Sequence, residues 1–264
     1  MDTGPLDGPT NMALDEALLT SFDPAVSSPV FRLYGWNPPA FSIGRFQDAD
    51  KTLDSVKCRD AGIDTVRRMT GGGLIYHADE ITYSIVCAQK HISGISSVKE
   101  TFRKLCAFLL HVYRKLGLDA AFAVDRNFRG ARLGRRTAIC FAGKEEYDII
   151  VEGRKIGGNA QRRIREVIFQ HGSIPLSNCL GEAMSYVLES EKPALLEQET
   201  ASLGELGFVP DSGKLKNILA ESFENNLEVS LIPSGPKEDE LRTMNHLRER
   251  KYSSAAWNRE GICD

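Results

Sequence analysis

Three consecutive glycines, Gly71, Gly72 and Gly73, interrupt the chain between two runs of β-forming residues. Glycine has no side chain to bury, and it loses more backbone freedom on ordering than any other residue. A folded chain therefore keeps three in a row only where the backbone needs a positive φ, or where something other than protein lies directly against it. The basic pair Arg67-Arg68 precedes this turn and His77 follows it, so polar groups flank the glycines on both sides.

Short runs rich in β-branched and aromatic residues surround the glycine turn and predict strands. They cover residues 29–36, 40–47, 63–68, 80–88, 120–124, 137–142, 147–158 and 167–176. Within the 147–158 run, Glu152 and Gly153 form a pair that is typical of a hairpin turn. Because the strands fill mostly the first two thirds of the chain and helical patterns follow them, the sequence predicts an α+β fold.

Two amphipathic patterns predict helices before residue 120. The first covers residues 10–22, with Thr10 available as its N-cap. The second begins at a capping box formed by Ser97 and Glu100, and it ends at Gly117. Its apolar stripe consists of Val98, Phe102, Leu105, Leu109, Val112 and Leu116.

The composition is that of a globular domain. Hydrophobic residues make up 42% of the 264 residues and charged residues 26%, and no linker rich in Pro, Gly and Ser divides the chain. We therefore expect a single catalytic domain over residues 1–264, with a helical segment at about 178–264. No apolar run approaches the roughly 18 residues that a membrane span requires, so we expect no membrane partner.

Charge and cysteine content exclude further classes of function. The 33 basic and 36 acidic residues leave a net charge of −3, so no overall field would attract nucleic acid. The six cysteines contain no CxxC pair and no regular spacing, which argues against a zinc site or a disulfide framework. The cysteine spacing leads us to expect no bound metal. No signal-peptide pattern begins the chain, so we expect a cytoplasmic protein.

The common signatures of nucleotide, serine-hydrolase and zinc chemistry are missing. The sequence contains no GxxxxGKS/T, GxGxxG, GxSxG or HExxH motif. What remains is a set of separated basic and glycine-rich elements. They are the segment around Gly71–Gly73, the segment GRKIGGNA at residues 153–160, and Gln170-His171-Gly172.

The order of these elements resembles the lipoate and biotin protein ligases together with the octanoyltransferases that share their fold. The resemblance covers most of the chain through NMALDEALL near the start, RRMTGGGLIYH, GRKIGGNAQRR, FQHGSIPL, and KYSSAAWN near the end. It implies a mixed sheet with flanking helices, whose glycine turns line a tunnel for an eight-carbon acyl chain. The implied substrate-binding residues are Arg67, Arg68, Gly71, Gly72, Gly73, His77, Gly157, Gly158, Asn159 and Ala160.

Within this resemblance, Lys155 matches the lysine that contacts the acyl carbonyl. Acyl transfer builds negative charge on the carbonyl oxygen, which needs backbone N–H groups or an ammonium beside it. Lys155 next to Gly157 and Gly158 offers both kinds of donor. The alternative is a surface lysine on a hairpin, because lysine is mostly exposed in proteins. His77 likewise is either a binding residue or a structural histidine.

The segment Ile139-Cys140-Phe141 resembles the one that carries the nucleophile in cysteine-dependent octanoyltransferases of the lipoate-ligase-like type. This resemblance implies transfer from octanoyl-acyl carrier protein to a lysine of a lipoyl domain, such as that of glycine cleavage H protein. A thioester is already activated, so the transfer needs a thiol relay and no cofactor. A nearby Lys155 ammonium would raise the thiolate fraction of Cys140. The alternative for Cys140 is a buried packing role.

Two other activities stay open. An ATP-dependent lipoate-protein ligase would use ATP, Mg²⁺ and free lipoate or octanoate in the same tunnel, with Arg67 or Arg68 and the glycine turn holding phosphate. An inactive or split-ligase binding subunit is the other alternative, because Ala78 stands where the family often has an acidic residue directly after the histidine. The chain also begins where relatives have already formed a first strand, so we expect that strand to be shortened or absent.

Overall fold

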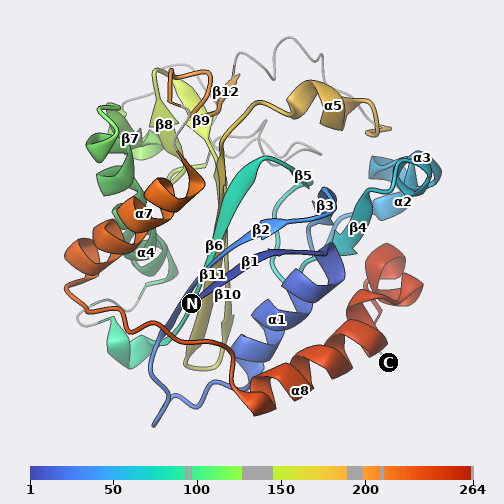
Figure 1. The fold of residues 1–264 in the computed structure, drawn as a ribbon, viewed down its shortest axis with the longest axis horizontal. Helices are drawn as coiled ribbons and strands as arrows, with labels where there is room; N and C mark the ends of the chain where they lie inside the picture. The colour runs from blue at the N-terminus through green and yellow to red at the C-terminus, as the bar shows by residue number, and fades with distance from the viewer. Residues whose placement is uncertain (93–94, 96, 127–144, 189–198, 209–210, 263–264) are drawn as a thin grey trace.

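A mixed five-stranded sheet forms the centre of the computed structural model, which describes residues 1–264 except 93–94, 96, 127–144, 189–198, 209–210 and 263–264 (Figure 1). In spatial order its strands are β1 (Asp2–Leu6), β2 (Val30–Trp36), β6 (Glu80–Ala88), β11 (Val167–Pro175) and β10 (Gly158–Ile164). β1 is parallel to β2, and the other neighbours are antiparallel. The α+β fold with a mixed sheet is therefore confirmed.

Two smaller sheets accompany the central one. The first has the order β4 (Asp64–Arg67), β3 (Ala40–Ile43), β5 (Ile75–His77). The second has the order β12 (Thr200–Ala201), β9 (Arg154–Ile156), β8 (Ile149–Val151), β7 (Ala120–Phe122). Each predicted strand run contains a strand, apart from 137–142, which lies outside the described residues. Glu152 and Gly153 have φ values of 50° and 80°, so the predicted hairpin turn is confirmed.

The N-terminus carries a short first strand, and its helix begins earlier than expected. The chain does form a first strand, β1, although this strand has only five residues. Helix α1 (Gly8–Thr20) also begins earlier than predicted, because Asp7 and not Thr10 is its N-cap. The Asp7 Oδ1 atom accepts a hydrogen bond from the Thr10 backbone N–H at 2.7 Å. Pro9 accounts for the earlier start, since proline fits the first turn of a helix.

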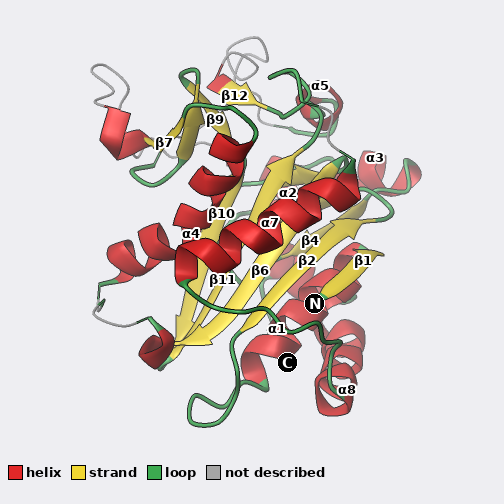
Figure 2. Ribbon diagram, turned by 60° about the vertical axis from the view of Figure 1, so that its left-hand side comes forward, coloured by secondary structure: helices red, strands yellow, loops and turns green. Residues whose placement is uncertain are grey.

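Helices α4 (Val98–Lys115) and α7 (Ser212–Leu227) pack side by side over one face of the central sheet (Figure 2). The predicted N-cap at Ser97 is confirmed, because its Oγ accepts from the Glu100 backbone N–H at 3.1 Å. The second bond of the predicted capping box differs, since the Glu100 carboxylate accepts from the Ser97 hydroxyl at 2.7 Å and not from the Ser97 backbone N–H. Gly117 follows the helix at φ 77°. Val98 is 58% exposed, so the predicted apolar stripe is wrong at its first position. The helix first becomes buried one turn later, at Thr101.

On the other face, α1 lies between the central sheet and α8 (Glu238–Leu247) (Figure 1). The KYSSAAWN segment follows α8 and anchors on α1. Lys251 Nζ lies 2.8 and 2.7 Å from the two carboxylate oxygens of Glu16, and Tyr252 donates its hydroxyl to the same carboxylate at 2.6 Å. All three side chains are nearly buried. The C-terminal segment is therefore held by a buried ion pair with additional hydrogen bonding, not by apolar packing alone.

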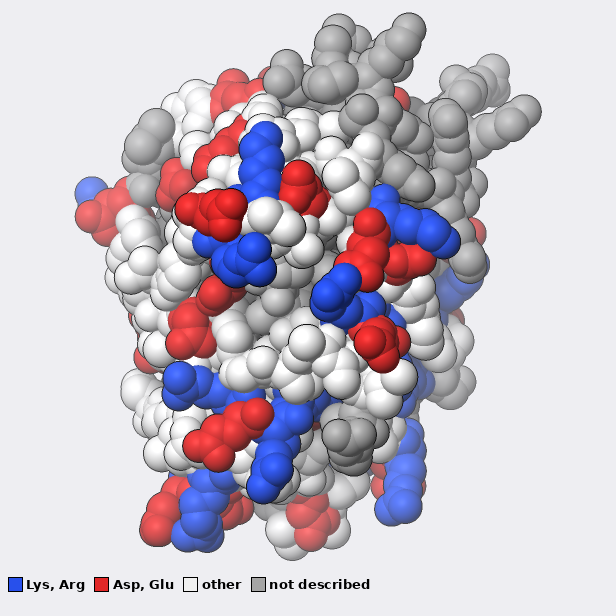
Figure 3. All heavy atoms as spheres, turned by 90° about the vertical axis from the view of Figure 1, so that its right-hand side faces the viewer, with Lys and Arg blue, Asp and Glu red and all other residues white. Residues whose placement is uncertain are grey.

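Three short α-helices, namely α2 (Ala49–Thr52), α3 (Ser55–Asp60) and α5 (Leu180–Met184), and several 3₁₀- and π-helical turns accompany these elements. The expected helical segment at about 178–264 contains α5, α7 and α8, but also the strand β12, which its sequence did not predict. Among the described helices, none has the length and apolar character to cross a membrane. Basic and acidic side chains are interspersed on the face shown in Figure 3, in keeping with the small net charge.

Candidate active site

The triple glycine forms a turn that is held by Arg68. Gly72 has φ 95°, a conformation that residues with side chains rarely adopt. The Arg68 Nη2 atom donates to the carbonyl oxygens of Gly71 at 2.8 Å and of Gly73 at 2.7 Å. A Cβ on Gly44 would lie 1.8 Å from the Gly72 carbonyl oxygen, so the neighbouring segment needs a glycine as well. The positive φ is one of the two reasons predicted for the glycines, and their contact with an acyl chain stays a prediction.

The turn geometry predicts opposite effects for two adjacent substitutions. Gly72→Ala places a Cβ at positive φ and should lower the free energy of unfolding by about 1–2 kcal/mol. Gly71 has no atom within 4 Å of its Cβ position and no positive φ, so Gly71→Ala should leave stability unchanged or raise it by up to about 1 kcal/mol. Urea unfolding of the two variants measures the difference. Equal losses at both positions would contradict this account of the turn.

The Arg67 side chain is held by hydrogen bonds to the protein backbone. Its guanidinium donates to five backbone carbonyl oxygens at 2.7–3.1 Å, those of Gly44, Arg45, Gln47, Trp257 and Arg259. Trp257 Nε1 donates back to the Arg67 carbonyl oxygen at 2.8 Å. Arg67 therefore joins β4 to the C-terminal segment. To hold a substrate phosphate, as the sequence allows, it would have to give up some of these bonds.

A cavity lies between the three-stranded sheet and the central sheet, and we call it the smaller cavity. Five of the predicted site residues line it, namely Arg68, His77, Gly158, Asn159 and Ala160. The remaining lining residues are Met12, Tyr34, Trp36, Ser42, Ile75, Thr82, His171, Gly172 and Ser173. The walls expose mainly apolar atoms. The fold thus brings together residues from β5 and β10 that stand about 80 positions apart in the sequence.

Both ring nitrogens of His77 have partners. Nε2 lies 2.7 Å from Ser42 Oγ, and Nδ1 lies 2.9 Å from Glu80 Oε1. The ring stacks on Trp36 with 4.0 Å between the ring centroids. Glu80 thus supplies the carboxylate that the sequence lacks at Ala78, because the turn from β5 to β6 returns Glu80 to the histidine. The departure at Ala78 does not deprive His77 of an acidic partner.

Three residues of the FQHGSIPL segment, His171, Gly172 and Ser173, line the smaller cavity without having been predicted as site residues. His171 Nε2 lies 2.7 Å from Thr70 Oγ1, and burial lowers the pKa of His171 well below its ordinary value, so the ring is neutral at pH 7. Ser173 is 3% exposed, and its Oγ has no hydrogen-bond partner in the part of the chain that the structure describes. Residues 171 and 173 share one face of β11, and this alternation is the sequence signal that could have found them.

The NMALDEALL segment contributes a buried charge network behind the cavity wall. Asp15 accepts hydrogen bonds from Arg32 at 2.7 Å, from the Tyr34 hydroxyl at 2.9 Å and from Ser84 at 2.8 Å. Arg32 also donates to Asn11 Oδ1 at 2.6 Å. Because both charges are compensated in this way, they can stay buried. The segment therefore fixes Tyr34 in the wall of the smaller cavity.

Lys155 is 2% exposed, so the alternative of a surface lysine is wrong. Its Nζ atom lies 2.8 Å from Asp148 Oδ2. Two residues later, Gly157 has φ 74°, and a Cβ on it would lie 2.2 Å from the carbonyl oxygen of Ser173. The strand that carries Lys155 is thereby held close to the Ser173 wall of the smaller cavity. Cys140, the predicted nucleophile, lies outside the described residues.

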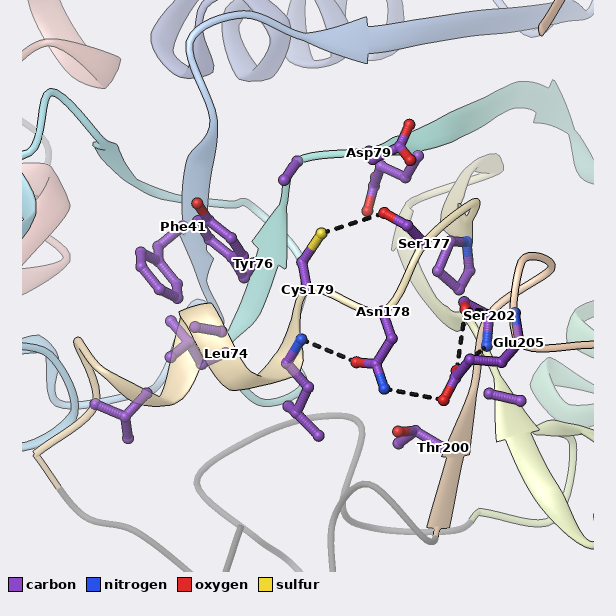
Figure 4. A pocket seen from close by; sticks show the side chains of 17 residues that line it. Phe41, Leu74, Tyr76, Asp79, Ser177, Asn178, Cys179, Thr200, Ser202 and Glu205 are labelled. Carbon is purple, nitrogen blue, oxygen red and sulfur yellow. Dashed lines mark hydrogen bonds between the residues drawn. The ribbon is translucent and has the colours of Figure 1, made fainter. Parts of the chain in front are cut away.

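A larger cavity lies on the opposite side of β5, since Tyr76 faces it while Ile75 and His77 face the smaller one. Figure 4 shows apolar side chains on one side of this larger cavity and polar groups on the other. Among the polar groups, Asn178 Nδ2 donates to Glu205 Oε1 at 3.1 Å. In the described part of the chain, no group of three or more His, Cys, Asp or Glu residues is placed to hold a metal ion.

Comparison with known proteins places the chain among related enzymes. A profile of the lipoyl protein ligase A/B catalytic domain matches residues 7–224. The chain belongs to this family. Several relatives of this ligase-family chain carry the name Octanoyltransferase LipM. That of Halalkalibacterium halodurans is 35% identical over 98% of this chain and 97% of the relative. Those of Geobacillus kaustophilus and Bacillus subtilis are 36% and 34% identical, each over 98% of this chain and 96% of the relative.

Solved structures confirm the fold of the lipoyl protein ligase family for this chain. The putative lipoate protein ligase Ta0514 of T. acidophilum with bound lipoic acid has a TM-score of 0.80 at 24% identity, covering 99% of this chain and 97% of that one. A lipoate-protein ligase A bound with ATP has a TM-score of 0.81 at 24% identity, with the same coverage. The predicted biotin/lipoate ligase catalytic-domain fold is thus confirmed.

Proposed function

We propose that the protein is an octanoyltransferase of lipoate biosynthesis, which moves an octanoyl group from acyl carrier protein to a lysine of a lipoyl domain. Relatives named Octanoyltransferase LipM match nearly the full length of the chain. The structural observation that carries the proposal is the smaller cavity, where five predicted substrate-binding residues meet around mainly apolar walls. Burying about six methylenes of an octanoyl chain at ~0.8 kcal/mol each would contribute roughly 5 kcal/mol to binding.

The proposed chemistry is a relay through Cys140. The Cys140 thiolate attacks the carbonyl carbon of the octanoyl thioester, and the tetrahedral oxyanion collapses with release of the carrier thiolate, which takes up a proton. The ε-amino group of the acceptor lysine then attacks the new thioester, an amide bond forms, and the Cys140 thiolate leaves as the amine loses its proton. The donor is already activated, so the relay uses no cofactor.

Each step passes through an oxyanion that needs hydrogen-bond donors. We propose that Lys155 supplies one of them and the backbone around Gly157 and Gly158 another. Lys155 has the burial that makes such a charge effective, because a low-dielectric surrounding strengthens its interaction with a developing oxyanion. Arg68 and the glycine turn are proposed to shape the acyl cavity, with His77 in its wall.

We further propose that residues 1–264 act as one catalytic domain in the cytoplasm. The C-terminal segment is anchored on α1 through Lys251 and Glu16 and on β4 through Arg67 and Trp257, so it is integral to the packing around the smaller cavity. The four cysteines within the described ranges are free thiols, which fits a reducing compartment.

A comparison of donors tests the proposal. The protein is incubated with a lipoyl domain and either octanoyl-acyl carrier protein, or octanoate with ATP and Mg²⁺, and the lipoyl domain is weighed by mass spectrometry. We expect modification from the carrier-bound thioester alone, without ATP. Modification only with octanoate and ATP would replace the transferase by the ligase alternative. No modification from either donor, with octanoate still bound, would favour the binding-subunit alternative.

A further inference from the structure

We infer that Ser173 binds the carbonyl oxygen of the acyl group through its side-chain hydroxyl, as a second side-chain donor in addition to Lys155. The inference deepens the proposed function and rests on it, because it requires an acyl group in the smaller cavity. Ser173 lines that cavity and is 3% exposed. Its Oγ has no hydrogen-bond partner within the described ranges of the chain.

The buried Ser173 hydroxyl lacks a hydrogen-bond partner among the described residues, and this requires an explanation. Burying a hydroxyl without a hydrogen bond is unfavourable, and the large majority of buried polar side-chain atoms in proteins have a partner. Other polar side chains of the same wall follow this rule. Ser42 pairs with His77, Thr82 with Trp36 and Glu80, His171 with Thr70, and Asn159 with Tyr83. Ser173 differs from them, which indicates that its partner is a ligand.

The position of Ser173 is fixed from both sides. In the central sheet it stands opposite Gly158 on β10 and opposite Thr82 on β6. The close approach of Gly157 to its carbonyl oxygen ties it to the strand that carries Lys155. The Ser173 backbone therefore lies against the end of the strand that carries Lys155, whereas His171, two residues away on β11, is bonded to Thr70 beside the glycine turn.

The chemistry of an octanoyl group leaves one choice of contact. Its carbonyl is its single polar group, and the rest of the chain is methylene and methyl. If the Ser173 hydroxyl contacted the methyl end of the acyl chain, it would have no hydrogen-bond partner, as among the described residues of the free protein. Only the carbonyl oxygen of the octanoyl group can accept its hydrogen bond. The O–H of Ser173 would donate to the carbonyl oxygen, and this bond would strengthen as the oxygen becomes an oxyanion. No proton is transferred.

The test compares Ser173→Ala with Ser222→Ala. Ser222 is a matched control, because it is also a fully buried serine whose Oγ lacks a partner in the described structure, but it lies in α7 and lines neither cavity. We expect Ser173→Ala to unfold at the same or a higher urea concentration than the wild type, while its kcat for octanoyl transfer falls by about 10²-fold. Ser222→Ala should keep wild-type kcat.

A spectroscopic measurement separates binding from a structural role. Octanoyl pantetheine labelled with ¹³C at the carbonyl is bound to each protein, and its carbonyl stretch is read by infrared difference spectroscopy. We expect a higher stretching frequency in Ser173→Ala than in the wild type, with Ser173→Thr closer to the wild type because it keeps a hydroxyl. An unchanged frequency together with unchanged kcat in Ser173→Ala would overturn the inference. A wild type that transfers no octanoyl would instead remove the proposed function.

Discussion

Cys140→Ala is expected to abolish octanoyl transfer and to leave no acyl group on the enzyme. When octanoyl-acyl carrier protein is mixed with the wild type in the absence of acceptor, the relay should stop at a thioester on Cys140. This adduct should add the mass of one octanoyl group and be removed by hydroxylamine. Cys140→Ser should also lose turnover, since a hydroxyl without an adjacent base is a far poorer nucleophile than a thiol. Intact-protein mass spectrometry of the wild type, Cys140→Ala and Cys140→Ser, each incubated with either donor, measures the octanoyl adduct.

Three buried cysteines, Cys58, Cys87 and Cys106, provide a control for the role of Cys140. Burial raises the pKa of Cys87 and of Cys106 to about 12, and it also raises the pKa of Cys58, so these thiols supply almost no thiolate at neutral pH. Cys58→Ala should therefore keep both the adduct and the transfer activity. The ligase alternative predicts that Cys140→Ala stays fully active with octanoate and ATP and that no adduct forms. That result would refute the assignment of Cys140.

Local sequence signals predicted the elements whose ends are set by local chemistry. The N-cap at Ser97, the stop at Gly117 and the hairpin turn at Glu152 and Gly153 all depend on residues within a few positions of one another. The start of α1 was predicted wrongly because two caps compete there. Asp7 and Thr10 are both good N-caps, and only the placement of Pro9 within the first turn favours the earlier one.

Long-range contacts explain what the sequence left open at the site. Arg67 and Arg68 are adjacent and chemically identical, yet Arg68 folds over the glycine turn while Arg67 binds carbonyls of a segment about 190 positions later. Nothing local distinguishes these two roles. The alternation along β11 could have placed Ser173 in the cavity wall, but its lack of a partner among the described residues could not have been predicted, because an unpaired hydroxyl is recognised only when every neighbouring polar group has been placed.

Lys155→Met is expected to lower the rate of octanoyl transfer by about 10²- to 10³-fold, the usual loss when a donor to an oxyanion is removed. Lys155→Arg should fail as well, because a planar guanidinium does not reproduce a compact ammonium. The structure adds a complication, since the Lys155 Nζ atom lies 2.8 Å from Asp148 and both side chains are buried. Removing the lysine alone leaves a buried carboxylate without its cation, at a cost of about 3–5 kcal/mol in stability.

The double variant Lys155→Met/Asp148→Asn separates the two effects. It removes both charges together, so it should recover most of the stability that the single variant loses, because replacing a whole buried ion pair is often close to neutral. Its transfer rate should nevertheless stay as low as that of Lys155→Met, because the donor to the oxyanion is still missing. Urea unfolding and the transfer assay on the same preparations give both quantities. A double variant that regains stability and activity together would mean that Lys155 only neutralises Asp148.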